Sequence, residues 1–503
     1  MLKRCSEKRD LTEWNAWRES NPREEIFLQG ADLSNFYLVE ADLHRANCHE
    51  AIFFEANCHD ANFYSANCHD AIFFEANCQD ANFYSANCRG AIFFEANCQN
   101  AKFLGANCQE ADFRNANCHE AKFFMANCQG ARFLGANCQE ANFFKANCQE
   151  ANFEHADCQK ANFSEAKCQE AIFDSANCHE ANFFIANCQE ASFLGANCQK
   201  AIFQQANCEE VNFFKANCQN AQFLGANCQK ANFEHADCQK ANFSKAKCQE
   251  VSFNEANCQG TQIYEARLEH ALFQNVILNH ETRIIRCEID DQTDFTNTSL
   301  SSVIIEPGKR AKLEQNIRRF GWEKWYRDKM EVKKPAHRFL NFLLVHVVRF
   351  FWYLSNYGYN TTRVLGWFAG FVIYFALFYT YFPCMLEIKG DPLSTFPFCF
   401  SWEVGNFWQM LAFATSTMVT LGFSNINVAV TNGIPDKWGM IVVSLNLMVG
   451  YFMLAVLVTR LAILFQTMGP GYVPPRKETE SDKKPDTQNA TSPSDGYNPA
   501  WPH

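Results

Sequence analysis

The sequence predicts two fold classes in one chain of 503 residues: a solenoid of short repeats, followed by a small α-helical module that spans a membrane. Three observations indicate this organisation. Cysteine occupies every tenth position from Cys48 to Cys258, and phenylalanine interleaves with it from Phe53 to Phe253. Near the C-terminus, two long uncharged stretches enclose the hexapeptide 420–425. The chain therefore divides into a repetitive first half and an apolar C-terminal part.

Residues 1–25 are expected to cap the solenoid, because the first coil of a stacked repeat exposes an apolar end. Trp14 and Trp17 lie three residues apart and share one face of a helix predicted over residues 11–18. The first ten residues are polar and charged, which predicts that no signal peptide precedes the repeat. We therefore expect the solenoid to lie in a reducing compartment.

The repeat domain is predicted over residues 26–305, and from residue 46 to Cys258 it alternates Ala-Asn-Cys-x-x with Ala-x-Phe-x-x. Leucines at the central positions extend the register toward residue 26. A period of five fits neither a helix nor a strand, so each unit is expected to form one side and one corner of a solenoid coil. The segment 52–58 recurs at 72–78 and 92–98, and 151–170 returns almost unchanged at 231–250. These longer repeats support a coil of twenty residues.

This pattern resembles the pentapeptide-repeat family. The resemblance implies a right-handed quadrilateral β-helix of about thirteen coils, about 60 Å long at the usual strand spacing. With four sides per coil, Cys ladders would line two opposite inner walls and Phe ladders the other two. Some proteins of this family imitate DNA and bind topoisomerases, which requires an acidic outer face. The Lys, His and Gln residues mixed into these walls disfavour that role.

Two interpretations of the Cys ladders are open. Buried Cys behaves as a small hydrophobic residue, and cytosolic thiols stay reduced. Alternatively, the ladders carry metal or redox chemistry, because Cα atoms one coil apart lie within disulfide distance. The sequence contains no Cys-x-x-Cys motif, which favours packing.

Aromatic residues also occupy positions that should face water. Phe54, Phe74 and Phe94 are expected on one outer wall, and Tyr64 and Tyr84 on the opposite one. Exposed apolar strips often mark contacts, so a neighbouring subunit is the preferred partner. A solvated strip without a role is the alternative.

Residues 306–360 are predicted to link the two parts. A charged helix is expected over 310–330. Residues 338–356 are apolar with a polar stripe at helical spacing, which favours a helix lying on the membrane surface. A third span is the alternative, and His346 and Arg349 at mid-length disfavour it.

The module 361–468 is predicted to contain two membrane spans, 364–382 and 439–459, each long enough to cross a bilayer. Residues 407–419 are apolar but too short to cross, which suits a re-entrant pore helix. The hexapeptide after it is predicted to form an ion filter, because irregular backbone at membrane depth is tolerated where its carbonyls line a water-filled path. Its residues are Thr420, Leu421, Gly422, Phe423, Ser424 and Asn425.

These features resemble the two-transmembrane pore module of potassium channels, whose filter reads Thr-x-Gly-Tyr/Phe-Gly-Asp. Thr420, Gly422 and Phe423 match that pattern. Ser424 stands where the channel pattern has its second glycine, and Asn425, at the outer mouth, stands where the pattern has an aspartate. A non-selective cation pore is therefore an alternative. Gly450 falls where the family has its gating hinge.

The resemblance implies a homotetramer with potassium ions bound by the carbonyls of residues 420–424. Ser444 and Asn446 lie within the second span and either line the pore or form a hydrogen bond between helices. No cofactor and no metal beyond the filter cations is expected. The function predicted is a tetrameric, potassium-selective cation channel with a solenoid of assembly or regulatory role. The alternatives are a non-selective monovalent cation channel and a membrane-anchored scaffold without transport.

Charge and composition complete the predictions. Basic residues gather before the first span, so a multi-pass protein of the cell (inner) membrane with both termini in the cytoplasm is expected.

Cys384 and Cys399 on the outer connector either form a disulfide or stay free. The tail 469–503 is predicted to be disordered. A net charge of −11 disfavours nucleic-acid binding, and the absence of catalytic motifs predicts that the protein is not an enzyme.

Overall fold

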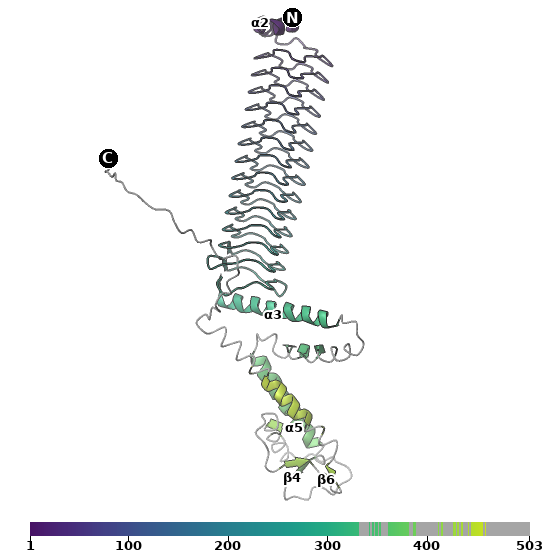
Figure 1. Ribbon diagram of the computed structural model, residues 1–503, viewed down its shortest axis with the longest axis vertical. Helices are drawn as coiled ribbons and strands as arrows, with labels where there is room; N and C mark the ends of the chain where they lie inside the picture. Colours follow the sequence, from purple (N-terminus) through teal and green to yellow (C-terminus); the bar gives the residue numbers. More distant parts are fainter. Residues whose placement is uncertain are drawn as a thin grey trace, which may run out of the picture.

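The computed structural model describes residues 1–330 continuously and shorter pieces of the chain beyond them. These pieces are 342, 345–346, 348–350, 352–353, 361–381, 386–388, 411, 414–415, 426–428, 430–431, 434–435, 441, 444–455 and 458. The repeat forms a straight rod with the N-terminal helices at one end, and helix α3 lies across the other (Figure 1).

The coils of the rod repeat every twenty residues, as predicted. Bridges pair each strand residue with the equivalent residue of the next coil in parallel, for example Asn47 with Asn67 and Ile52 with Ile72. The backbone N–H of Cys48 donates to the carbonyl of Asn67 at 2.8 Å. Such bonds continue along the rod, so each coil satisfies the backbone polar groups of its neighbours. The predicted β-helix is confirmed.

The core of the rod consists of the predicted Cys and Phe ladders. Phe53 and Phe73 on adjacent coils stack with centroids 4.5 Å apart and planes at 2°. Phe53 also meets Phe63 of the opposite ladder edge to face, at 5.6 Å and 86°. Both arrangements are favourable for aromatic rings, and together they fill the interior without a channel. The Cys residues from 48 to 258 are buried beside them.

Asparagine ladders strengthen the two walls that carry Cys. The side-chain amide of Asn67 donates to Oδ1 of Asn47 at 3.1 Å. The same oxygen accepts the backbone N–H of His49 at 3.3 Å. Each Asn therefore joins two coils and also fixes its own corner, where non-glycine residues such as Glu50 adopt a left-handed φ of 56°.

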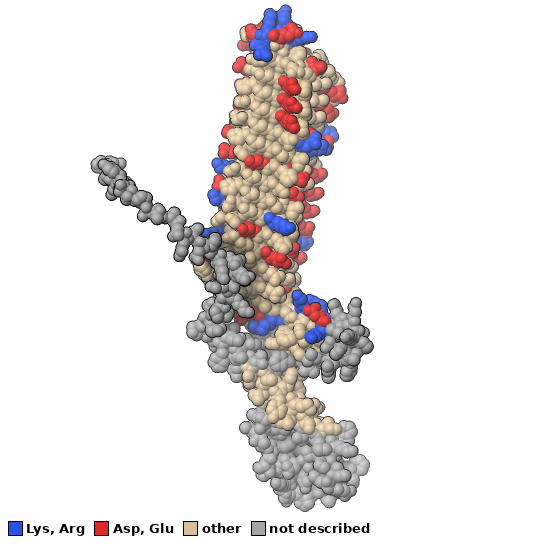
Figure 2. Space-filling view, viewed as in Figure 1, with Lys and Arg blue, Asp and Glu red and all other residues tan. Residues whose placement is uncertain are grey.

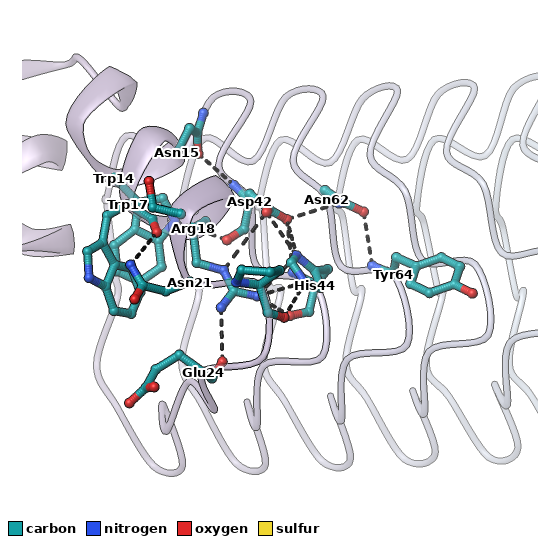
Figure 3. Close-up of polar contacts among 12 residues, drawn as sticks. Trp14, Asn15, Trp17, Arg18, Asn21, Glu24, Asp42, His44, Asn62 and Tyr64 are labelled. Atoms are coloured by element: carbon teal, nitrogen blue, oxygen red, sulfur yellow. Dashed lines mark hydrogen bonds and ion pairs between the residues drawn. The ribbon is translucent and has the colours of Figure 1, made fainter.

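Two helices cover the N-terminal end, α1 (Leu2–Lys8) and α2 (Thr12–Ser20). Trp14 of α2 donates its indole N–H to the carbonyl of Asp42 at 3.0 Å. Arg18 lies buried over the first coils and donates to the carbonyls of Glu24 and His44 at 3.0 and 2.7 Å (Figure 3). The capping segment therefore contains a second helix, α1, that the sequence analysis did not propose.

The C-terminal end of the rod departs from the twenty-residue period. Strands β1 (Gln262–Tyr264), β2 (Arg283–Ile285) and β3 (Ile304–Ile305) pair in parallel. Gln262 pairs with Arg283, and Arg283 pairs with Ile304, so each of these coils has one extra residue. The buried hydroxyl of Thr282 donates to the carbonyl of Cys258 at 3.0 Å, which fixes the longer corner.

Helix α3 (Pro307–Met330) closes this end. Leu313 is fully buried against the last coil. Asn316 donates its amide to the carbonyls of Asp290 and Thr293 at 2.8 and 2.9 Å. The helix therefore supplies both apolar cover and hydrogen-bond donors to the exposed edge of the β-helix.

Beyond α3, helix α5 (Thr361–Tyr381) packs against the helical residues 444–455. Val364 and Met453 are both buried at this contact. Two short antiparallel pairs are also described, β4 (Leu386–Ile388) with β5 (Ile426–Val428), and β6 (Val430–Thr431) with β7 (Ile434–Pro435).

In the described ranges, no helix combines the length and the apolar character needed to cross a membrane. The predicted spans 364–382 and 439–459 each extend past the described residues. Only short helical pieces of the predicted interfacial helix 338–356 are described.

Candidate interaction surface

The residues of the predicted ion filter, 420–425, lie outside the described part of the chain, as do Cys384 and Cys399. Ser444, Asn446 and Gly450 are described and lie together on one helical stretch. Ser444 is exposed and Gly450 is buried. Asn446 is fully buried, and neither end of its amide has a hydrogen-bond partner among the described residues. Neither role proposed for Asn446, pore lining or a bond between helices, is therefore demonstrated.

The most distinctive outer surface of the rod is a stack of three aromatic rings near its N-terminal end. Phe54 and Phe74 stack at 5.4 Å and 14°, and Phe74 and Phe94 at 5.4 Å and 7°. Their position follows from the repeat, because residues twenty apart lie directly above one another. We call these rings, with the isoleucines beside them, the aromatic patch. Its members are Ile52, Phe54, Ile72, Phe74, Ile92 and Phe94.

Charged residues bound the aromatic patch. Glu55, Glu75 and Glu95 lie at the adjoining corner and are exposed. A short vertical row of acidic side chains is visible near the N-terminal end of the rod in Figure 2. On the next coil, Arg114 places its guanidinium 5.3 Å from the centroid of Phe94 and pairs with Asp112 at 2.7 Å. The patch is thus a defined apolar area with an acidic edge and a polar end.

The opposite outer wall carries a second, longer row of apolar residues. Tyr64 and Tyr84 stack at 5.4 Å and 9°. Apolar residues recur at the same position further along, and their neighbours Met125 and Ile185 are exposed. These further residues are Leu104, Phe124, Phe144, Phe184 and Leu224. Polar Ser164 and Gln204 interrupt the row, so its C-terminal half is less continuous than the aromatic patch.

The Cys ladders are closed to solvent. All described Cys residues are buried and unpaired. Burial is the main influence on the pKa of Cys78 and Cys108 and raises it well above the usual range of a thiol. Hydrogen bonds from the thiols of Cys138 and Cys98 lower the pKa of Cys118, and burial of this thiol opposes them.

Burial decides the protonation state of the ladders. No Lys, Arg or His side chain is buried between residues 48 and 258, all of which are described. A thiolate there would have only other thiols to stabilise it, and burying an unpaired charge is strongly unfavourable. We therefore expect the ladders to stay protonated near neutral pH and to serve packing.

One group of described side chains has the geometry to hold a metal ion, namely His49, His69 and Asp70. These residues come from two adjacent coils on one Cys-bearing wall. These residues were not among the predicted site residues, although the spacing of twenty between the two histidines was a usable signal.

A comparison with known protein families identifies the repeat that forms the rod. The pattern described as Pentapeptide repeats matches in eight copies between residues 28 and 279. Residues 28–279 form a pentapeptide-repeat domain. The matched copies end before the C-terminal helices, so the resemblance of 361–468 to potassium channels receives no support here.

Part of this chain is similar to solved structures. One is HetL, a pentapeptide-repeat protein involved in heterocyst differentiation regulation from the cyanobacterium Nostoc sp. strain PCC 7120. HetL is 21% identical to this chain, and the alignment covers 40% of this chain and 89% of HetL with a TM-score of 0.26. Full-length QnrB1, a plasmid-mediated fluoroquinolone resistance protein, is 16% identical over 42% of this chain and 91% of its own, with a TM-score of 0.17. No curated protein matches. At these scores the likenesses carry no argument about function.

Proposed function

We propose that the protein is a scaffold whose pentapeptide-repeat domain binds a partner through the aromatic patch, and whose C-terminal helices anchor it to a membrane. The single observation that carries the proposal is the stack of Phe54, Phe74 and Phe94 on the outside of the rod. The core is filled by side chains, so the outer walls are the available binding surfaces. The three rings are half-buried and stack on one another, and apolar outer surfaces of this kind are typical of contact surfaces.

The charges around the patch define the partner. The exposed row of Glu55, Glu75 and Glu95 favours a partner with an apolar strip and basic residues beside it. Arg114, paired with Asp112, closes the C-terminal end of the patch with a polar group of compensated charge. A partner segment should therefore cover about three coils, or about 15 Å, of this wall.

The scaffold proposal is tested by removing the rings while keeping the coils. In the triple variant Phe54→Ser, Phe74→Ser and Phe94→Ser, the inward Phe ladder is untouched, so the rod should remain folded. The native complex, measured by light scattering after mild detergent extraction, should lose the mass of its partner. The control is Leu194→Ser, on the same wall but outside the patch. Retention of the full mass by the triple variant would refute the proposal.

A second candidate function is the tetrameric cation channel, potassium-selective or non-selective. The observation that favours it is the exposed apolar surface of the helices on either side of the filter sequence. Leu365 and Ile373 of α5 are 51% and 48% exposed, and Met448 is 62% exposed. A lipid bilayer or neighbouring subunits would cover such a surface. Localisation in the cell membrane, with both termini cytoplasmic, is part of both the scaffold proposal and the channel proposal.

The channel proposal is tested in lipid vesicles that contain the purified full chain. A potassium gradient should drive a current, and its reversal potential under a potassium-to-sodium gradient separates the selective from the non-selective form. A variant with Thr420→Ala and Gly422→Ala should abolish selectivity or conduction. If the wild-type chain carries no current above that of empty vesicles, the protein is a scaffold without transport.

A further inference from the structure

We propose that the pentapeptide-repeat domain binds one divalent transition-metal ion between two adjacent coils, at His49, His69 and Asp70. Each of the three residues offers one ligand atom, and these atoms all lie within 4.8 Å of one another. Among the residues that the structure describes, this is the one group of His, Cys, Asp and Glu with such geometry. The two imidazole rings lie 5.1 Å apart, one coil above the other.

The hydrogen bonding of His49 prepares it as a ligand. Its Nδ1 lies 3.0 Å from the carbonyl oxygen of His69. A carbonyl can only accept a hydrogen bond, so Nδ1 carries the proton and Nε2 keeps its lone pair. A backbone bond of this kind to the far nitrogen is the usual support of a metal-binding imidazole. The same bond ties the two histidines to each other across the coils.

The position of Asp70 depends on a glycine in the next coil. Gly90 has a φ of +63°, and a Cβ at this residue would lie 2.2 Å from Oδ1 of Asp70. The carboxylate of Asp70 therefore occupies space that any other residue at position 90 would fill. Its Oδ2 lies 2.9 Å from Nδ1 of His69. Gly90 thus allows the third ligand to lie beside the two rings.

The charges near the site also favour a cation. Oε1 of Glu50 lies 3.7 Å from Nε2 of His49 and adds a second carboxylate. The one basic neighbour on this wall is Arg89, whose guanidinium pairs at 3.8 Å with Glu110, further along the rod. With neutral imidazoles, the two carboxylates give the site a net negative charge that a divalent ion would offset.

The ligand set indicates the kind of metal. Two imidazoles and a carboxylate suit Zn²⁺ or a neighbouring ion such as Co²⁺ or Ni²⁺, with water completing the coordination. In a tetrahedral site with bonds of about 2.1 Å, the ligand atoms lie about 3.4 Å apart. The side chains of His49 and His69 are 29% and 33% exposed, so ring rotations can shorten the present separation. The ion would cross-link two coils beside the aromatic patch.

The test uses the purified full chain under reducing conditions, with Co²⁺ as the probe in an absorption titration. One ion per chain should produce visible bands of a nitrogen and oxygen site without the intense near-ultraviolet absorption of cobalt thiolate. His49→Gln and His69→Gln should each weaken binding about tenfold or more, and Gly90→Ala should also weaken it by displacing Asp70. The matched control is His119→Gln.

His119 is a suitable control because it also lies beside a carboxylate, that of Glu120 at 3.7 Å, but faces Gln99 and Gln139 on the adjacent coils. Circular dichroism should show an unchanged fold in all four variants. Equal binding by the wild type and both His variants would overturn the proposal. So would a spectrum dominated by thiolate absorption, because it would place the ion at a Cys ladder.

Discussion

The ring of Phe53 lies parallel to the ring of Phe73 on the next coil, with centroids 4.5 Å apart and planes at 2°. This relationship repeats along the whole Phe ladder and explains why side chains fill the interior of the rod. Each ring stacks on the rings one coil above and one coil below, so loss of a ring should destabilise mainly the adjacent coils.

Phe153→Ala should destabilise the middle of the rod by about 3 to 5 kcal/mol, because it leaves a large cavity in the ladder. Phe153 stacks on Phe133 and Phe173 at 4.7 and 4.8 Å. Hydrogen exchange should show faster opening at these coils and little change at the capping helices. Phe144→Ala, on an outer wall, is the control and should cost far less. Uniform loss of protection along the rod would contradict this local account.

Lys167→Asn should stabilise the domain by about 0.5 to 1.5 kcal/mol. Lys167 interrupts an Asn ladder, because Asn147 and Asn187 occupy the same position on the adjacent coils. An asparagine there could donate to Oδ1 of Asn147 and accept from the amide of Asn187. The urea midpoint measures the effect, and Lys167→Ala, which removes the lysine without supplying an amide, is the control. An unchanged midpoint would show that the ladders do not contribute to stability.

Arg18→Met should loosen the N-terminal cap. The buried guanidinium donates to the carbonyls of Glu24 and His44, and these acceptors would lose their partner at a cost of about 1 to 3 kcal/mol each. Limited proteolysis should then cleave near α2 sooner than in the wild type. The exposed Arg23→Met variant should resemble the wild type. Equal cleavage rates in both variants would argue against a capping role for Arg18.

Thiol labelling should separate the buried ladders from the rest of the chain. Of 26 Cys residues, 24 are described and buried. A charged thiol reagent should therefore modify no more than the two remaining residues, Cys384 and Cys399, until denaturant unfolds the rod. Rapid native labelling of more than two thiols would contradict the packing role of the ladders.

Alkaline pH should weaken the fold. The pKa is raised above the usual value at most of the ladder thiols, Cys78 and Cys108 among them, and unfolding would return each thiol to its ordinary pKa. The unfolded chain then loses protons first, so stability is complete below a pH of about 8.5 and falls as the pH rises further. The urea midpoint should be lower at pH 10 than at pH 7. A midpoint that rises over this interval would contradict the direction of these shifts.

The regular part of the fold was predictable because its signal is strictly periodic. A spacing of ten between Cys48 and Cys58, with recurrence every twenty, is compatible with few architectures, and the ladders follow from it. The aromatic patch followed from the same register. Helix α1 was not predicted. A break of the register at Arg283 and a distorted last coil are visible in the sequence, and the structure shows one extra residue in each of these coils.

The metal site was not predicted, for a different reason. His49 is one coil away from the adjacent ligands His69 and Asp70, so it appears unrelated to them until the twenty-residue period is applied. The role of Gly90 depends on the direction of the Asp70 side chain, which periodicity does not determine. The filter motif 420–425 stays a prediction from sequence.

Photo-crosslinking from the aromatic patch tests the scaffold proposal most directly. A photoreactive phenylalanine analogue is placed at Phe74 in the full chain within native cells, with Leu194 on the same wall as the matched position. We expect one defined crosslinked product at Phe74, mapped to an apolar segment with adjacent basic residues, and none at Leu194. Equal crosslinking at both positions, or none at Phe74, would contradict it.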